Sequence, residues 1–228
     1  MNTVTSERRA SGLGRDYGYS NARIRGMKSR LLGVDFLERL MSVSDIPALL
    51  PALLETEYGP DLEERIIHGR DATQIDLALR DNMVRTFRKV LGLLNDEAYE
   101  LVTTLLGRWD LFNLKTVVRG KHMHLSREEI EESLMPAGQL SDFELDELAA
   151  AEDVRAVVDI VGTWGFGYAS ALRTGFAQYM KTGELPDLEL ALDRHYSEWA
   201  AARLVRRGAN AEIGLEQAQG GQKVHRVD

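Results

Sequence analysis

The chain of 228 residues contains no cysteine, which excludes disulfides, thiolate catalysis and cysteine-ligated zinc. It also lacks any run close to the roughly 18 consecutive apolar residues that a membrane-spanning helix needs. Basic residues are in deficit, with 28 Lys and Arg against 36 Asp and Glu and a formal net charge of −8. Because a nucleic-acid binder normally has a basic footprint, we expect no nucleic-acid partner and no direct membrane span.

The sequence also lacks the signals of β-strands and of a signal peptide. No window alternates apolar and polar residues between hairpin turns. The first 16 residues carry charges, including Glu7, Arg8 and Arg9, where a signal peptide would have an apolar core. Residues 1–16 are therefore expected to form a flexible N-terminal segment.

Helical periodicity is the dominant pattern that the chain does have. Apolar residues recur at spacings of three and four in the stripe formed by Ile75, Leu79, Met83, Phe87, Val90, Leu91 and Leu94. Shorter stripes join Leu172 to Phe176 and Leu192 to Tyr196. With 44% hydrophobic residues available for a core, we predict an all-α fold of about ten helices.

Capping residues divide these helices. Ser126 with Glu129 and Ser141 with Glu144 fit the capping box. The other expected boundaries are N-caps at Asn95 or Asp96, at Asp110 and at Asp153, a first-turn proline at Pro47, a kink or restart at Pro51, and C-terminal glycines at Gly107, Gly120, Gly162, Gly183 and Gly208. Residues 209–228 have few large apolar side chains, so we expect a disordered tail there.

The chain repeats itself at low similarity. The tripeptide Asn-Ala-Arg that begins at Asn21 returns as Asn-Leu-Lys at Asn113. Segments that begin at Leu37, Ser44 and Leu77 return in the same order as those at Leu145, Glu152 and Leu190. An ordered set of matches predicts two divergent copies of one helical unit, and it argues against a pocket built from residues that occur once.

Two groups of polar residues are candidates for an interface. Four basic residues fall within eight positions: Arg23, Arg25, Lys28 and Arg30. They form either a contact face for an acidic partner or a solvated helix face. Asn21, Asn113 and Lys115 belong to the repeated tripeptide, where they either contribute to an interface or serve a structural role inside each copy, such as capping a helix start.

Other constellations fall short of an active site. His122 and His124 supply two imidazoles, which do not complete a metal site. The glycine-rich segment 162–167 lacks the Gly-Lys-Ser/Thr ending of a phosphate loop and is interpreted as a turn between helices. The acidic runs at 128–132 and 142–147 are interpreted as solvated helix faces. We therefore predict no catalytic, cofactor-binding or metal-binding residues.

Three segments resemble a known family. Residues 19–31 and 110–120, together with 190–196, are similar to the C subunit of A-type and V-type rotary ATP synthases, which is related to the d subunit of the vacuolar ATPase. The resemblance covers roughly residues 16–204. It implies an all-α funnel of three related units around a pseudo-three-fold axis. In the family, this funnel sits on the membrane ring of proteolipid subunits and receives the central shaft.

The resemblance also implies what the chain does. It predicts a non-catalytic central-stalk subunit without a cofactor, at the cytoplasmic face of the membrane, that couples shaft and ring for ATP-linked proton or sodium transport. The expected units are residues 17–107, residues 108–187 and, at 188–208, the first helix of a truncated third unit. The alternative is a soluble helical scaffold or regulatory adaptor without a rotary partner.

Overall fold

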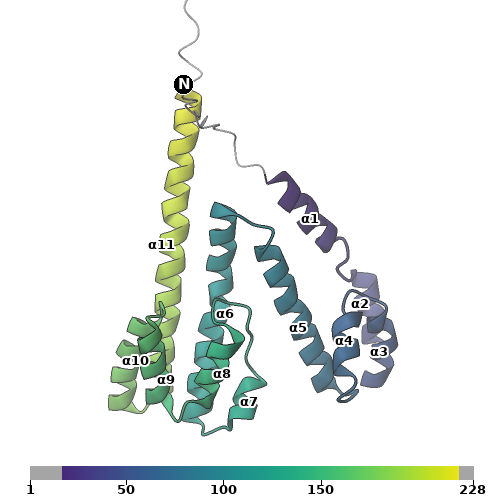
Figure 1. The fold of residues 1–228 in the computed structure, drawn as a ribbon, viewed down its shortest axis with the longest axis horizontal. Helices are drawn as coiled ribbons and strands as arrows, with labels where there is room; N and C mark the ends of the chain where they lie inside the picture. Colours follow the sequence, from purple (N-terminus) through teal and green to yellow (C-terminus); the bar gives the residue numbers. More distant parts are fainter. Residues whose placement is uncertain (1–16, 221–228) are drawn as a thin grey trace, which may run out of the picture. The chain divides into compact units, whose positions relative to one another are not determined.

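A computed structural model describes residues 17–220, with side chains described as far as residue 205. Within that range all regular secondary structure is helical, which confirms the all-α class; it has eleven helices where about ten were expected. The helices are α1 (Gly18–Lys28), α2 (Val34–Met41), α3 (Ile46–Leu54), α4 (Gly59–Arg65), α5 (Ala72–Leu91), α6 (Asp96–His122), α7 (Arg127–Glu131), α8 (Asp142–Ala150), α9 (Val154–Trp164), α10 (Ala169–Thr182) and α11 (Leu185–Gly220) (Figure 1).

The chain divides into two compact units, residues 1–79 and 80–228. Helix α5 crosses the division, so its first two turns belong to the first unit. The expected division between residues 107 and 108 lies inside α6, and the expected start at residue 188 lies inside α11. The arrangement as repeated units therefore stays a prediction, and the expected N-terminal segment 1–16 lies outside the described residues.

The first unit has a small core formed by helices α3 and α4, which pack against each other, and by the first turns of α5. Its fully or nearly buried members are Leu50, Leu53, Leu62, Ile75 and Ala78. Asp45 caps α3 by accepting a hydrogen bond from the backbone N–H of Ala48 at 2.9 Å.

Two prolines test the sequence expectations in α3. Pro47 lies in the first turn as predicted, whereas Pro51 lies inside a helix that continues to Leu54 without a restart. Burial of Leu50 and Leu53 holds this short helix together, because tertiary packing contributes more to helix stability than local propensity does.

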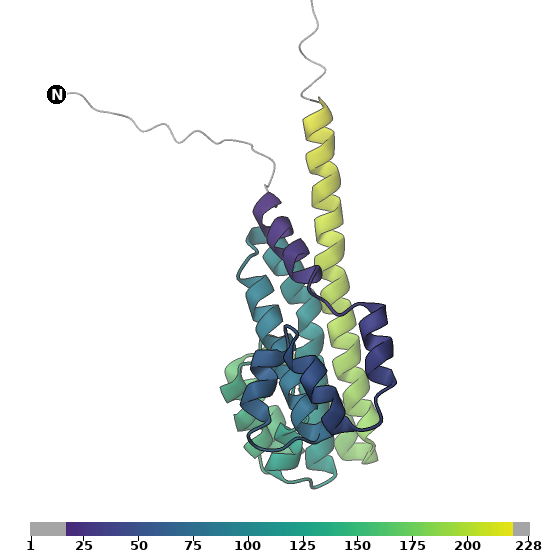
Figure 2. The ribbon, with the colours of Figure 1, turned by 90° about the vertical axis from the view of Figure 1, so that its right-hand side faces the viewer.

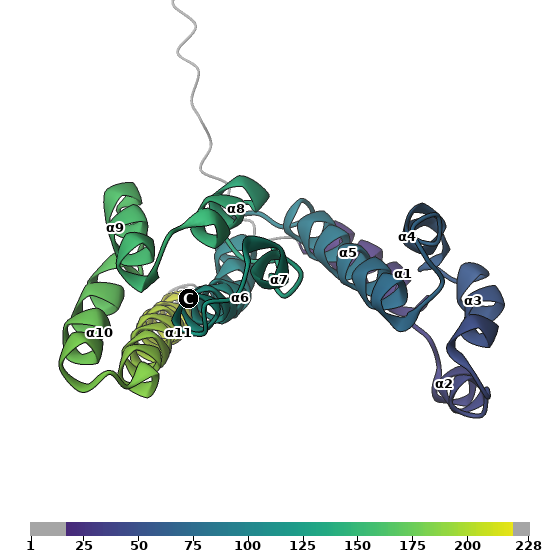
Figure 3. The same ribbon diagram turned by 90° about the horizontal axis from the view of Figure 1, so that it is seen from below.

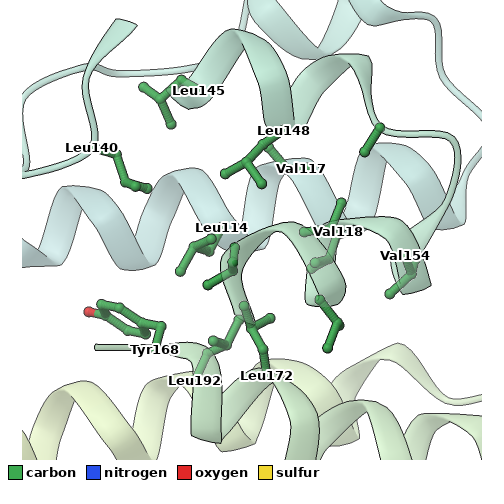
Figure 4. Close-up of a cluster of buried hydrophobic side chains, with 14 of the residues drawn as sticks. Leu114, Val117, Val118, Leu140, Leu145, Leu148, Val154, Tyr168, Leu172 and Leu192 are labelled. Carbon is green, nitrogen blue, oxygen red and sulfur yellow. The ribbon is translucent and has the colours of Figure 1, made fainter. Parts of the chain in front are cut away.

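The second unit is built around α6, which is 27 residues long. Helices α7, α8, α9 and α11 all pack on α6, and α10 packs against α9 and α11. In Figure 3, α8 and α9 lie on the same side of the α6–α11 pair. The core lies between these elements, and Figure 4 shows Leu114, Val117 and Val118 of α6 meeting side chains from α8, α10 and α11.

Several predicted helix boundaries are confirmed. The capping boxes of Ser126 with Glu129 and of Ser141 with Glu144 begin α7 and α8. The side chain of Asp153 caps α9, Asn95 is the N-cap residue of α6, and Gly183, with φ of 73°, is the C-cap residue of α10. The positive φ at Gly183 is a left-handed conformation that glycine adopts without the steric cost of a Cβ atom.

Other predicted boundaries are wrong. Gly107, Gly120 and Asp110 lie inside α6, and Gly162 lies inside α9, which ends at Trp164 with Gly165 as its C-cap. The interior glycines of α6 serve packing: a Cβ on Gly107 would lie 3.1 Å from the Trp199 ring, and one on Gly120 would overlap the side chain of Ile130.

Helix α11 also continues beyond its predicted end. It passes Gly208 and reaches Gly220, and residues 221–228 lie outside the described residues (Figure 2). The expectation of a disordered tail over residues 209–228 stays a prediction. The segment after Gly208 contains mostly Ala, Glu, Gln and Leu, which are strong helix formers. Local propensity therefore sustains a helix where the sequence offers little to bury.

Helices α10 and α11 approach each other closely at Gly175. A Cβ on this residue would lie 2.8 Å from the Cα of Leu188 and 3.1 Å from its carbonyl oxygen. Both atoms belong to the backbone of α11, so a side chain here could not be accommodated by rotating a neighbour.

We therefore expect Gly175→Ala to lower the free energy of unfolding by about 1–3 kcal/mol, the usual cost of overpacking. The matched control is Gly162→Ala in α9, where the closest atom within reach of the new Cβ is Arg173 Nη1 at 3.9 Å. That substitution should raise the free energy of unfolding by about 0.5–1 kcal/mol through helix propensity. Urea titration measures both, and equal effects of the two substitutions would contradict the close approach.

Candidate functional site

The basic candidates of the first unit lie on and just after α1. Arg23, Arg25 and Lys28 are exposed, and no described residue of α1 is buried. Arg30 is also exposed, and its Nε lies 3.2 Å from Glu57 Oε2. Exposed ion pairs of this kind contribute little to stability, so this cluster, which we call the α1 basic face, is available for contact with a partner.

The two repeated asparagines have different environments. Asn21 is exposed on α1, whereas Asn113 is fully buried inside α6. The Nδ2 of Asn113 donates to the carbonyl oxygen of Met135 at 2.6 Å, and its Oδ1 accepts from the Met135 N–H at 2.7 Å. The expectation that the repeated asparagine caps a helix start is wrong for Asn113, which instead pairs with the backbone between α7 and α8.

Asp110 lies one turn earlier on the same face of α6 and is fully buried. Its carboxylate accepts hydrogen bonds from the N–H groups of Gln139 at 2.8 Å and Leu140 at 2.9 Å. Burial raises the pKa of Asp110 above its usual value, and the two backbone N–H groups partly oppose this shift. A Cβ on Gly138 would overlap the carboxylate, so this position needs glycine.

Helices α6 and α11 are joined by an ion-pair seam of four side chains. Lys115 Nζ lies 2.8 Å from Asp193 Oδ2 and 3.6 Å from Glu189 Oε2. Arg119 makes a bidentate contact with Glu189: its Nε donates to Oε1, and its Nη2 donates to Oε2 at 2.7 Å. These contacts lower the pKa of Glu189, with the hydrogen bond from Arg119 as the main cause. Lys115, a predicted interface residue, is thus engaged within the protein.

An open groove of about 620 Å³ runs beside this seam, and the described residues that line it belong to α6 and α11. We call it the α6–α11 groove. The α6 wall carries Leu105, Trp109 and Phe112, and the α11 wall carries Tyr196. Trp109 and Phe112 meet edge to face with ring centroids 5.7 Å apart. The groove was not predicted from the sequence, although its signal is present there as an apolar series at positions 105, 109 and 112, at spacings of four and three.

The histidine candidates lie near a second hollow of about 380 Å³ at the end of α6. His122 Nδ1 lies 2.8 Å from the hydroxyl oxygen of Tyr179, and His124 also lines the hollow. Lys121 donates to the carbonyl oxygen of Ala149, and burial lowers its pKa. Among the described residues, no group of three or more His, Asp or Glu side chains is arranged to hold a metal ion.

None of the helices in the described part of the chain combines the length and apolarity that crossing a membrane requires.

Comparisons with known proteins identify relatives of the chain. The family model described as ATP synthase (C/AC39) subunit matches residues 20–214. The chain is 31% identical over 207 residues to the C subunit of a V-type ATP synthase from Deinococcus radiodurans, and the match covers 89% of this chain and 59% of the relative. It is 33% identical over 196 residues to the C subunit of an A-type ATP synthase from Methanococcoides burtonii, covering 85% of this chain and 52% of the relative. The chain thus spans between about half and three fifths of the length of these relatives.

The two repeated asparagines provide a matched pair for mutation. Asn113→Ala removes both hydrogen bonds to Met135 and leaves two partly buried backbone groups unsatisfied, so we expect a loss of about 2–4 kcal/mol in the free energy of unfolding. Asn21→Ala changes an exposed side chain and should stay within about 0.5 kcal/mol. Chemical denaturation of both variants tests this, and a similar loss at the two positions would contradict the difference in burial.

The ion-pair seam predicts that the free energy of unfolding depends on pH. Because the pKa of Glu189 is below its ordinary value of 4.5 in the folded state, the ion pair stabilises the fold above that value and its contribution disappears as the pH falls through the folded pKa. We expect Glu189→Gln to cost about 1 kcal/mol near neutral pH and progressively less on acidification. Unfolding measured from about pH 7 to about pH 3 checks this; in an Arg119→Leu background the effect of Glu189→Gln should shrink.

Proposed function

The chain belongs to the ATP synthase (C/AC39) subunit family, and on this premise we propose that it is a non-catalytic central-stalk subunit of a V/A-type rotary ATP synthase. In this role it would couple the rotating shaft to the membrane ring of proteolipid subunits, for ATP-linked transport of protons or sodium ions. Its place would be peripheral, at the cytoplasmic face of the membrane.

The observation that carries this proposal is the extent of the family match. It includes helices of both compact units and continues into α11. A match confined to one helical hairpin would support only a shared motif, whereas this one follows the order of nearly all described helices.

A coupling role places a mechanical demand on the protein. Moving one charge across 100 mV is worth about 2.3 kcal/mol, so several charges per ATP would load the joint with energy on the order of 10 kcal/mol. Packed helices and the ion-pair seam between α6 and α11 suit a stiff element. A joint that holds this load calls for a broad interface, larger than a small polar patch.

The α1 basic face is our candidate for the electrostatic part of that interface. Its cations are exposed on an otherwise acidic chain with a net charge of −8, so they would attract an acidic surface on the shaft or ring. Arg30 is the weaker member because it already pairs with Glu57.

Charge reversal tests this role. We expect the double variant Arg23→Glu and Lys28→Glu to reduce co-purification of the tagged chain with shaft and proteolipid subunits, because attraction becomes repulsion. The control is Arg173→Glu with Lys181→Glu, which changes net charge equally at exposed positions of α10. Quantitative mass spectrometry of complexes extracted from membranes of the source organism gives the measurement.

The outcomes separate the proposals. Co-purification that survives reversal on α1 would remove the α1 basic face from the interface while keeping the rotary partner. A chain that recovers no shaft or ring subunit even without substitutions would instead support the alternative, a helical scaffold or regulatory adaptor.

A further inference from the structure

The α6–α11 groove has an apolar lining that the protein itself leaves exposed. Leu105 is 56% exposed and Phe112 is 42% exposed. Both lie about 180° around α6 from the buried Leu114, since each helical residue turns by about 100°. They are not scattered surface residues: with Trp109 between them they form one stripe, which is the pattern that marks an interaction site.

Charge defines the rim of the same groove. Lys115 and Arg119 are balanced by Asp193 and Glu189 in the ion-pair seam. Arg108 is different, because no acidic side chain among residues 17–205 pairs with it. Its guanidinium is exposed and lies 6.0 Å from the centroid of the Trp109 ring. The groove therefore presents one uncompensated cation above an aromatic floor, on a chain whose net charge is −8.

The walls of the groove are held in place before any partner binds. The seam fixes α11 against α6, and Tyr196 Oη of α11 lies 3.4 Å from the carbonyl oxygen of Leu105. A rigid groove loses less conformational entropy on binding than a flexible one. Lining residues run from Leu105 to Arg119, which corresponds to about 21 Å of helix at about 1.5 Å per residue.

We propose that the α6–α11 groove binds an amphipathic helix of a partner protein, with apolar residues along one stripe and a carboxylate placed to meet Arg108. A helix of about four turns matches the length of the groove. The apolar stripe would cover Leu105, Trp109 and Phe112, as in other helix-in-groove complexes. This proposal does not depend on a rotary complex, because it concerns the chemistry of one surface of the second unit.

The test uses a display library of helix-forming peptides of about 18 residues, long enough for the groove at about 1.5 Å per residue. Four stripe positions vary among Leu, Ile, Phe and Trp, and flanking positions are Glu or Lys. Selection is carried out on the immobilised full chain, and enriched peptides are measured by fluorescence anisotropy. We expect enriched peptides to carry Glu at one flank and to bind the unmodified chain.

Two groove variants decide the site. The double substitution Leu105→Ser and Phe112→Ser should weaken binding more than about tenfold, because it removes the apolar wall. Arg108→Glu should weaken Glu-flanked peptides about tenfold and favour Lys-flanked ones. The control is Leu190→Ser, an exposed apolar residue of α11 that does not line the groove; its affinity should equal that of the unmodified chain.

Circular dichroism and thermal unfolding confirm that each variant is folded, which is expected because the substituted side chains are exposed. Failure to enrich any peptide would overturn the proposal, as would binding that the groove variants leave unchanged. An equal preference for Glu and Lys flanks would overturn the role of Arg108. Self-association of the chain that the double substitution Leu105→Ser and Phe112→Ser abolishes would assign the groove to a second copy and likewise overturn the proposal of a separate partner.

Discussion

The hydrogen bonds that Asp110 and Asn113 make with the segment between α7 and α8 are the constraint on which the second unit depends. Neither polar side chain can be buried in α6 at low cost unless it is fully paired. Their partners are backbone groups of residues 135–140, so the segment must follow α6 closely. It thereby delivers Ser141, the cap of α8, to the point from which Leu145 and Leu148 reach the core.

The exposure of the opposite face of α6 is a consequence of the same packing. Once one face of α6 is committed to the core, the residues half a turn away must face α11 or solvent. Gly175 sets how closely α11 can lie against α10, and the seam from Lys115 and Arg119 sets its position along α6. What remains uncovered between the two long helices is the α6–α11 groove. An exposed apolar stripe is thus a geometric consequence of how the core is closed.

Local signals were predictable from the sequence and long-range ones were not. The capping boxes depend on residues three apart, so the pattern Ser126 to Glu129 was sufficient. A glycine that ends a helix and one that admits a neighbouring ring look alike in sequence, which is why Gly107 was assigned wrongly. Asp110 resembled an N-cap because a single sequence does not show which distant groups a side chain meets. In the structure, its carboxylate accepts a hydrogen bond from the backbone N–H of a residue 29 positions later. The repeat revealed candidate residues, although it did not distinguish exposed Asn21 from buried Asn113.

The two candidate surfaces differ in the physics by which they would hold a partner. Exposed cations on α1 act through solvent, where salt screens charges over about 8 Å at physiological ionic strength. Such contacts raise association rates and select partners more than they resist dissociation. A partner in the α6–α11 groove would instead bury aromatic and aliphatic side chains, which mainly slows dissociation. If both proposals hold, the α1 basic face would speed encounter with a partner and the α6–α11 groove would slow its release.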